Sequence, residues 1–267
     1  MKVMELLKTA GFSFKKGLGQ NYLLDENYLD TVVATMGLKN TDVVVEVGTG
    51  AGTLTRAISR VAGTVHTWEI DRRLEPVLAY QFDGHTNINL NFGDAMQQDN
   101  LTPTNTPFKV VANIPYYITT PLITKFMADP NCTEIIVLVQ LEMGLRMVAK
   151  SGADFGAITV GIAAWGNATM LRRVGRGLFI PQPNVDSAFV RIVKHDKPML
   201  ENHDAFGTFL KSIFSMRRKT IMNGLVAAVG ISRDIAAHVL DTAGIAHDTR
   251  PEQITATQFV QMFNALT

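Results

Sequence analysis

The chain has 267 residues, of which 46% are hydrophobic, so it can bury the core of one large domain or of a large and a small one. Its 25 Lys and Arg residues nearly balance 24 Asp and Glu residues, which excludes a globally basic nucleic-acid binder and requires basic contacts to be local. The single cysteine, Cys132, excludes an intrachain disulfide and a cysteine zinc site, and fits the reducing cytoplasm, where we expect the protein. We expect no membrane span and no secretory signal, because the apolar runs are too short.

A glycine-rich loop follows a short amphipathic helix predicted for residues 1–10. The loop, residues 15–19, has glycines that let its backbone approach a ligand closely. The amides of Gln20 and Asn21 and the apolar side chain of Leu23 follow it and could border such a ligand. A polar loop that only precedes a helix is the alternative.

Strands and helices alternate over the first 150 residues. Runs of apolar, often β-branched residues predict strands at 42–47, 64–70, 88–92, 108–112 and 134–140. Helices are predicted at 26–36, 54–61, 72–82, from about 118, and at 142–149. This alternation predicts a doubly wound α/β sheet with five parallel strands.

A glycine-rich turn after the first of these strands predicts a nucleoside-binding cradle. Gly48 and Gly50 follow the strand directly, but Thr53 stands where the dinucleotide fingerprint has its third glycine. Glu69 ends the next strand, where an acidic residue can bond ribose hydroxyls. Asp94, on the turn after the third strand, could accept a hydrogen bond from an adenine amino group. A structural βαβ unit, with Asp94 as a turn or capping residue, is the alternative.

The turn after the fourth strand, Asn113-Ile114-Pro115-Tyr116, suits chemistry on an exocyclic amine such as the 6-amino group of adenine. The lone pair of that nitrogen is delocalised into the ring. An asparagine oxygen and a backbone carbonyl can each accept one of its N–H bonds and free the lone pair. Pro115 has a fixed φ and stiffens the turn, and Tyr116 can stack on a base. An ordinary turn with a packed tyrosine is the alternative.

Two β-rich runs, residues 158–164 and 187–193, are predicted to be the last strands, antiparallel to each other. A local basic patch suited to phosphates lies between them. It consists of Arg172, Arg173 and Arg176. Phe179 precedes a proline loop and is predicted to form the second face of a base sandwich. The alternatives are a solvated surface for the arginines and a core position for Phe179.

The pattern becomes purely helical from about residue 205, after a polar linker at 194–202. A second basic cluster, Arg217, Arg218 and Lys219, opens a helix of this region and predicts an RNA-backbone contact or a charged surface. We therefore expect a catalytic domain at 1–194 and a helical RNA-binding domain at 195–267.

Nine segments, spread over almost the whole chain, occur in the same order in one known family. They read GLGQNYL, EVGTGAGTLT, WEID, GDA, NIPYYIT, VQLEMGLR, FIPQPNVDSAFV, FSMRRKT and RPEQIT. As a set they resemble the ribosomal RNA adenine dimethyltransferases, and within them the KsgA type, which acts on small-subunit rRNA.

The resemblance implies a Rossmann-like class I methyltransferase sheet with a small all-helical C-terminal domain. It implies transfer of methyl groups from S-adenosylmethionine to the 6-amino group of adenines in 16S rRNA, giving dimethyladenosine, with a role in ribosome assembly. The expected partner is the small ribosomal subunit, the expected state is a monomer, and no metal is required.

The resemblance also implies roles for individual residues. Those expected to bind the cofactor are Gln20, Asn21, Leu23, Gly48, Gly50, Glu69, Asp94 and Asn113. Of these, Glu69 would bind the ribose and Asp94 the adenine. Asn113 and the carbonyl of Ile114 or Pro115 would hold the target amine, with Tyr116 and Phe179 stacking the base.

Three residues depart from the family pattern. Leu141 stands where a lysine is usual, Phe155 where a tyrosine is common, and Tyr117 where an asparagine is frequent. They avoid the expected cofactor contacts and bear on RNA affinity and target choice.

Two alternatives stay open: an Erm-type methyltransferase of large-subunit (23S) rRNA, and a non-catalytic RNA-binding assembly factor. The MRRKT and RPEQIT segments favour the small-subunit type, and the retained cofactor residues argue against a pure binder.

Overall fold

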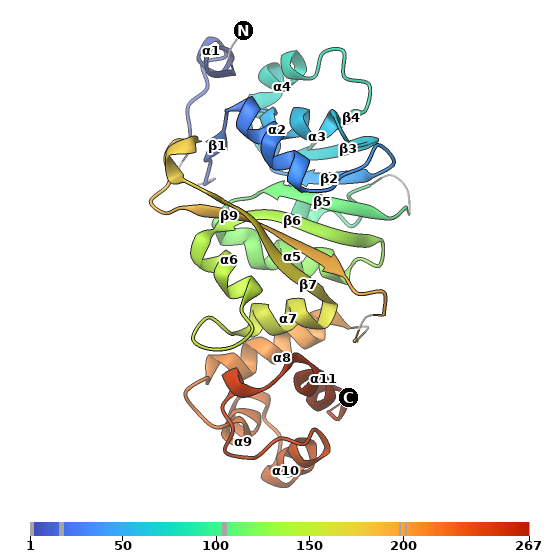
Figure 1. Cartoon of the computed structure of the whole chain (residues 1–267), viewed down its shortest axis with the longest axis vertical. Coiled ribbons are helices and arrows are strands. Elements are labelled where there is room, and N and C mark those ends of the chain that lie inside the picture. Colours follow the sequence, from blue (N-terminus) through green and yellow to red (C-terminus); the bar gives the residue numbers. More distant parts are fainter. Residues whose placement is uncertain (1–2, 16–18, 103–105, 198, 201, 267) are drawn as a thin grey trace. The chain divides into compact units, whose positions relative to one another are not determined.

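The computed structural model describes residues 3–15, 19–102, 106–197, 199–200 and 202–266. Residues 16–18 of the predicted glycine-rich loop lie outside them. The chain forms two compact units, Met1–Gly144 with Met170–Arg191, and Leu145–Thr169 with Ile192–Thr267 (Figure 1). It passes from one unit to the other within α6 (Leu141–Val148), β7 (Gly166–Val174) and β9 (Ser187–Lys194).

A seven-stranded sheet organises the first unit, in the order β4-β3-β2-β5-β6-β9-β7 (Figure 1). The five predicted parallel strands are confirmed. They are β2 (Val43–Val47), β3 (Thr64–Glu69), β4 (Ile88–Phe92), β5 (Phe108–Asn113) and β6 (Cys132–Gln140). The strand order reverses between β2 and β5, and open α/β sheets bind ligands beyond the carboxyl ends of the strands at such a point.

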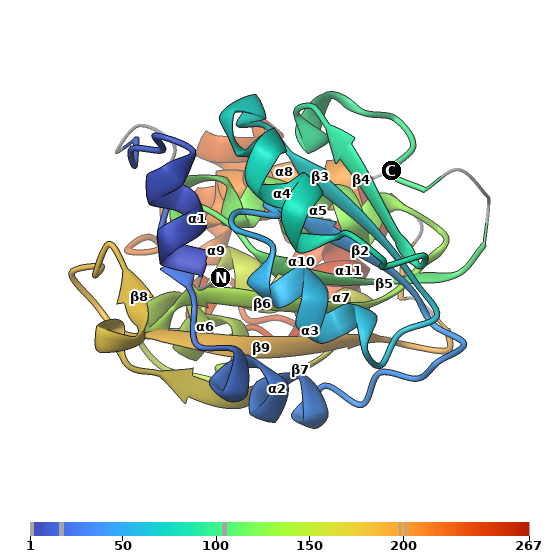
Figure 2. The same ribbon diagram turned by 90° about the horizontal axis from the view of Figure 1, so that it is seen from above.

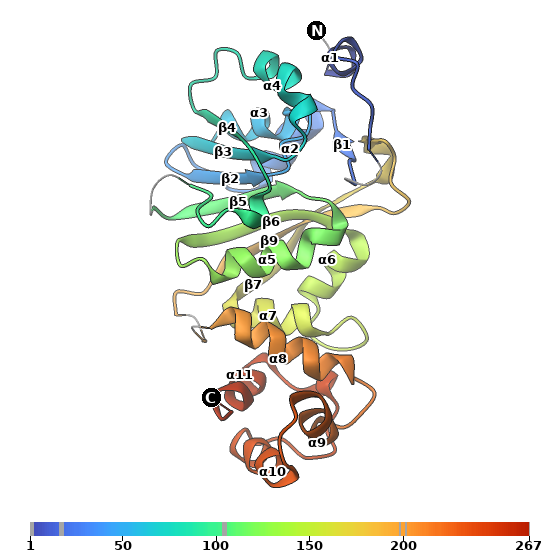
Figure 3. The ribbon, with the colours of Figure 1, turned by 180° about the vertical axis from the view of Figure 1, so that it is seen from behind.

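Helices cover both faces of the sheet. The helices in this part of the chain are α1 (Val3–Thr9), α2 (Glu26–Thr35), α3 (Thr53–Ser59), α4 (Glu75–Gln81), α5 (Thr119–Ala128) and α6. Helices α2 and α3 lie on one face (Figure 1), and α5 lies on the other (Figure 3). The fully buried side chains of Leu29, Ile58, Val111 and Ile136 join α2 and α3 to the sheet. This packing fixes the strand ends from which the functional turns leave.

A small second sheet pairs the N-terminal part of the chain with a distant segment. Strand β1 (Tyr22–Leu23) runs antiparallel to β8 (Phe179–Ile180), with Leu23 opposite Phe179. Figure 2 shows the chain after α1 passing beside β8 before it enters α2. The sequence carries no signal for this pair, because two-residue strands are too short to show a period.

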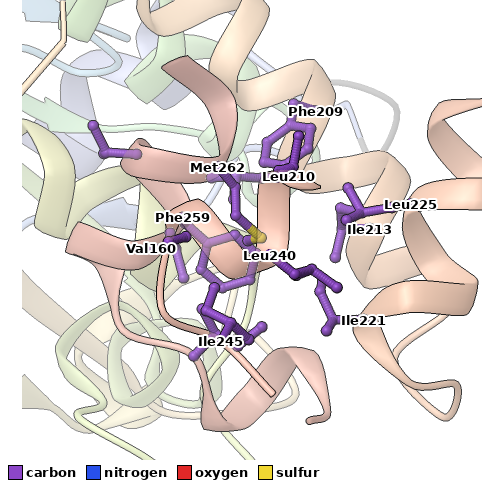
Figure 4. Packing of buried hydrophobic residues seen from close by; sticks show 14 of the residues in the cluster. Val160, Phe209, Leu210, Ile213, Ile221, Leu225, Leu240, Ile245, Phe259 and Met262 are labelled. Atoms are coloured by element: carbon purple, nitrogen blue, oxygen red, sulfur yellow. The ribbon is translucent and has the colours of Figure 1, made fainter. Parts of the chain in front are cut away.

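The second unit is helical and has its own core. Its elements are α7 (Ala157–Trp165), α8 (His203–Ser215), α9 (Ile221–Gly224), a π-helical turn (Leu225–Val229), α10 (Arg233–Thr242) and α11 (Ala256–Asn264). Aliphatic side chains, aromatic rings and methionines from these elements pack together (Figure 4). Phe155 and Val160 belong to the same cluster as Phe206, so residues 145–169 group with the helical unit, whereas the expected boundary was at 194.

The prediction of a strand at residues 158–164 is wrong, because this segment lies within helix α7. The apolar run shows neither a period of two nor a period of 3.6, and its length alone does not separate the two structures. Gly156 starts the helix, its N–H donating to the Thr159 hydroxyl at 3.1 Å. The strand next to β9 in the sheet is β7, and it carries Arg172 and Arg173.

In the part of the chain that the structure describes, no helix is both long and apolar enough to cross a bilayer.

Candidate active site

A cavity of about 240 Å³ opens at the carboxyl end of the sheet in the first unit. Five segments line it: 19–23 before α2, 47–51 with 53–54 after β2, 68–70 at the end of β3, 93–96 after β4 and 113–118 after β5. Every predicted cofactor-binding residue lies in this wall. Ile114, Pro115 and Tyr116 lie there too. The structure therefore brings together residues that are up to about a hundred positions apart in the chain.

The glycine turn after β2 lies directly against the end of β5. Gly48 has a φ of +85°, and a Cβ atom there would meet the Asn113 carbonyl oxygen at 3.1 Å. Gly50 has a φ of +55°, and a Cβ there would meet the ring of Tyr22 at 3.1 Å. Both positions need glycine, because side chains rarely adopt this backbone region and space is short. Larger residues would displace the cavity wall.

Glu69 connects the glycine turn to the end of β3. Its side chain is 5% exposed, and its two oxygens accept from the N–H groups of Gly50 and Asp71, both at 2.8 Å. Burial raises the pKa of the Glu69 carboxyl, and the backbone donors partly oppose that rise. A carboxylate oxygen has several lone pairs, so Glu69 can still accept bonds from a diol in the cavity.

Asp94 combines the predicted ligand position with the alternative capping role. It lines the cavity, and one of its oxygens accepts from the Met96 N–H at 2.9 Å. Lys125 anchors the loop that follows Asp94, because its ammonium donates to the carbonyls of Met96 and Gln98 at 3.1 and 2.5 Å.

The amide of Asn113 has a defined orientation. Its Nδ2 donates to the backbone carbonyl of Asn21 at 3.2 Å, so its nitrogen is engaged and its oxygen is directed away from that contact. The Pro115 carbonyl accepts from the Ile118 N–H at 3.1 Å. Ile114 is buried and also lines the cavity. The turn thus places two acceptors, the Asn113 oxygen and the Ile114 carbonyl, next to each other in the chain.

Two tyrosines follow this turn and differ in their surroundings. The Tyr116 hydroxyl pairs with the Ser187 hydroxyl at 3.0 Å, which anchors the far end of its ring. Tyr117 also lines the cavity but is 66% exposed. In the sequence, Tyr117 stands out only as a departure from a family pattern. Its position directly after Tyr116 is the feature of the sequence that could have predicted a second aromatic side chain at the cavity.

Phe179 and the predicted basic residues lie outside the cavity wall. Phe179 is 3% exposed in β8 and belongs to the core cluster that contains Leu23, so neither face of its ring is open to a base in this structure. The first basic group is exposed, with Arg172 placed over the ring of Tyr28 at 5.4 Å. In the second unit Arg217, Arg218 and Lys219 are exposed on the connection between α8 and α9.

Among the described residues, no group of three or more His, Cys, Asp and Glu side chains could hold an ion. The carboxylates and backbone groups of the cavity wall can bond to a nucleoside, and the turn at Asn113 can accept hydrogen bonds from an amine.

The sequence matches the family described as Ribosomal RNA adenine dimethylase over residues 11–267. It is 36% identical to the Ribosomal RNA small subunit methyltransferase A of Lysinibacillus sphaericus, over 100% of this chain and 95% of that protein. It is also 36% identical to the protein of that name from Enterococcus faecalis, over 99% and 94% of the two chains.

Two solved structures resemble this one over most of their length. A dimethyladenosine transferase from Plasmodium falciparum has a TM-score of 0.74 at 25% identity, covering 88% of this chain and 94% of that one. The 23S rRNA methyltransferase ErmE has a TM-score of 0.69 at 27% identity, covering 92% and 99%.

Proposed function

Because the chain belongs to the ribosomal RNA adenine dimethylase family, we propose that it transfers methyl groups to the 6-amino group of adenines in small-subunit ribosomal RNA. Relatives with 36% identity over nearly their whole length carry the name of a small-subunit methyltransferase, which supports this choice of subunit. The observation that carries the chemistry is the turn at Asn113, held at the wall of a nucleoside-sized cavity.

In this proposal the turn binds the target amine through two acceptors. The Asn113 oxygen accepts one N–H, because the amide nitrogen is already bonded to Asn21. We assign the second N–H to the Ile114 carbonyl, which is the backbone acceptor next to Asn113 in the chain; one of the two lone pairs of the Pro115 carbonyl is already used by the Ile118 N–H at 3.1 Å. Two accepted bonds draw the nitrogen toward tetrahedral geometry and make its lone pair available. Tyr116, anchored by Ser187, is the ring that stacks on the flipped adenine.

The cavity residues fit S-adenosylmethionine. The positive-φ glycine turn gives a close backbone approach, Glu69 is a ribose acceptor and Asp94 an adenine acceptor, all along one wall. When bound, S-adenosylmethionine supplies a methyl group on a positively charged sulfur. The residues of the chain contribute by holding the amine and excluding water, so positioning accounts for most of the rate.

The exposed basic groups are proposed contacts for the RNA backbone. Arg172, Arg173 and Arg176 lie in the first unit, and Arg217, Arg218 and Lys219 in the second. Because the chain as a whole is nearly neutral, such local groups must supply the attraction to phosphates. We place the activity in the cytoplasm and propose a role in assembly of the small subunit.

The test is methyl transfer from labelled S-adenosylmethionine to purified ribosomal subunits that lack their own adenine methylation. Small and large subunits are assayed side by side, and the products are digested to nucleosides. We expect dimethyladenosine from the small subunit only.

Label in the large subunit alone would favour the second candidate, an Erm-type activity, which the similarity to ErmE keeps open. Binding of the cofactor without label in either subunit would contradict both activities. That result would favour an RNA-binding assembly factor.

A further inference from the structure

The N-terminal segment of the first unit, here residues 12–15 and 19–24, reaches the candidate catalytic amide. The Asn21 carbonyl is the acceptor for the Asn113 Nδ2. The terminal torsion of an asparagine side chain is soft and nearly two-fold, so the Asn113 backbone does not by itself select which of its two ends faces the cavity. A carbonyl can only accept. The Asn21 contact therefore selects the orientation that leaves the Asn113 oxygen free for the amine.

An ion pair between Asp71 and Arg73 also holds this segment in place. The Asp71 carboxylate, 6% exposed, accepts from both the Nε and the Nη2 of Arg73, at 2.8 and 2.5 Å. The Arg73 hydrogen bond is the main reason why the pKa of Asp71 lies below its usual range. A bidentate pair of this kind has a fixed geometry as well as a favourable energy.

Both partners of this pair bind the N-terminal segment. The Gln20 amide donates to Asp71 at 2.9 Å, and its oxygen accepts from the Lys15 N–H at 2.9 Å. Arg73 donates through Nη1 to the Ser13 carbonyl at 3.1 Å and lies over the Phe12 ring at 4.9 Å. Both polar ends of Gln20 are thus used to fasten the segment, next to Asn21 in the chain.

We propose that Asp71 and Arg73 are positioning residues for methyl transfer: by fastening the N-terminal segment they keep the Asn21 carbonyl where it orients the Asn113 amide. The sequence of contacts runs from Arg73 to Asp71, to Gln20, along the backbone to Asn21 and then to Asn113. This inference rests on the proposed function for its kinetic consequence, but the orientation of the amide can be measured without activity.

The test compares Arg73→Ala and the near-isosteric Asp71→Asn with Arg72→Ala as the matched control. Arg72 is the adjacent arginine, and its guanidinium lies over the ring of Phe92 at 5.4 Å. With asparagine labelled by ¹⁵N, the side-chain NH₂ signal of Asn113 is identified by its loss in Asn113→Ala. Its chemical shift and hydrogen exchange report the bond to Asn21. The kcat and KM values are measured in parallel with the dissociation constant for S-adenosylmethionine.

For Arg73→Ala and Asp71→Asn we expect faster exchange of the Asn113 NH₂ group and a kcat lowered about tenfold. The cofactor dissociation constant should rise less than threefold. Arg73→Lys should recover part of the lost kcat, and Arg72→Ala should resemble the wild type.

An unchanged Asn113 signal in both variants overturns the proposal, whatever happens to turnover. So does a changed signal with an unaltered kcat. If the wild type transfers no methyl group to adenine, the proposed function fails, while the Asn113 signal still decides the structural claim.

Discussion

The two units of the chain bury very different side chains. In the first unit the interior near the cavity contains carboxylates and hydroxyls, among them Glu46, Thr67, Glu69 and Asp71. In the part of the chain that the structure describes, the buried polar side chains of the helical unit are limited to Thr159 and His203. Its core consists of aromatic rings and aliphatic side chains, as Figure 4 shows for the residues around Phe259.

The polar interior of the first unit and the apolar core of the helical unit have different roles. A buried polar group costs free energy unless it is bonded, so interiors optimised only for stability avoid it. The first unit bonds its buried groups to the glycine turn and to the strand ends, which line the cavity. The helical unit has no such network among its described residues, and its packing is the expected source of its stability.

The largest expected effect is on the core of the helical unit. Phe259 is fully buried, with ring centroids 5.5 Å from Phe214 and 6.5 Å from Phe209. We expect Phe259→Ala to lower the free energy of unfolding by about 3–5 kcal/mol, because it removes a large side chain and leaves a cavity. Denaturant titration measures the free energy of unfolding, and the control is Ile235→Ala, because Ile235 is half-exposed. A loss as small as that of the control would contradict the packing described here.

Asn113→Ala, unlike Phe259→Ala, should change catalysis rather than stability. We expect turnover to fall by about a hundred- to a thousandfold, as for other polar groups that act on the reacting atoms, with little change in stability. Cofactor affinity, measured by calorimetry, should stay within a few-fold of the wild type. Asn89→Ala, an exposed asparagine on β4, is the control. A variant at position 113 with a near-normal rate would refute the role of the amide.

Glu46 makes the polar interior sensitive to pH. Its carboxyl is fully buried and accepts from the hydroxyls of Thr55 and Thr67, both at 2.6 Å. Burial raises the pKa of Glu46 from 4.5 to about 8. Between these values the folded state holds a proton that the unfolded state has lost, so raising the pH favours unfolding, by up to about 1.4 kcal/mol per pH unit.

The matched variant is Glu46→Gln, which stays neutral and keeps an acceptor for the two threonines. We expect its free energy of unfolding to decline less than that of the wild type between about pH 5 and pH 8. Denaturant titrations across this range provide the comparison. Parallel curves for the two proteins would show that Glu46 is not the group responsible.

The smallest expected effect concerns Tyr117, the exposed aromatic of the cavity. Stacking of a base on an aromatic ring contributes about 1–3 kcal/mol, and the lower end of this range, which we expect for an exposed ring, means that Tyr117→Ala should weaken binding of the RNA substrate about five- to tenfold. Tyr117→Phe should keep most of the affinity. The control is Tyr80→Ala, because Tyr80 is 54% exposed on α4 and lies outside the cavity wall. Equal effects of the two alanine variants would remove Tyr117 from the RNA-binding surface.

The sequence by itself determined the parallel sheet and the candidate site. Strands β2 to β6 are runs of apolar and β-branched residues bounded by turns, and they lie within a residue or two of their predicted ranges. Carboxyl ends of parallel strands share one edge, so the order of strands and turns is enough to place Gly48, Glu69, Asp94 and Asn113 together. Local pattern was sufficient there, because each signal lies within a few residues of the element that it defines.

Only the tertiary structure decided what depends on partners distant in the chain. Residues 158–164 form a helix because they pack into the core of the helical unit, which their mostly apolar sequence does not reveal. Phe179 is buried because it pairs with Leu23, and the Asn113 amide is oriented because Asn21 lies beside it. Pairings between residues about 90 to 160 positions apart leave no local period, so only the folded chain determines which faces and which atoms remain available.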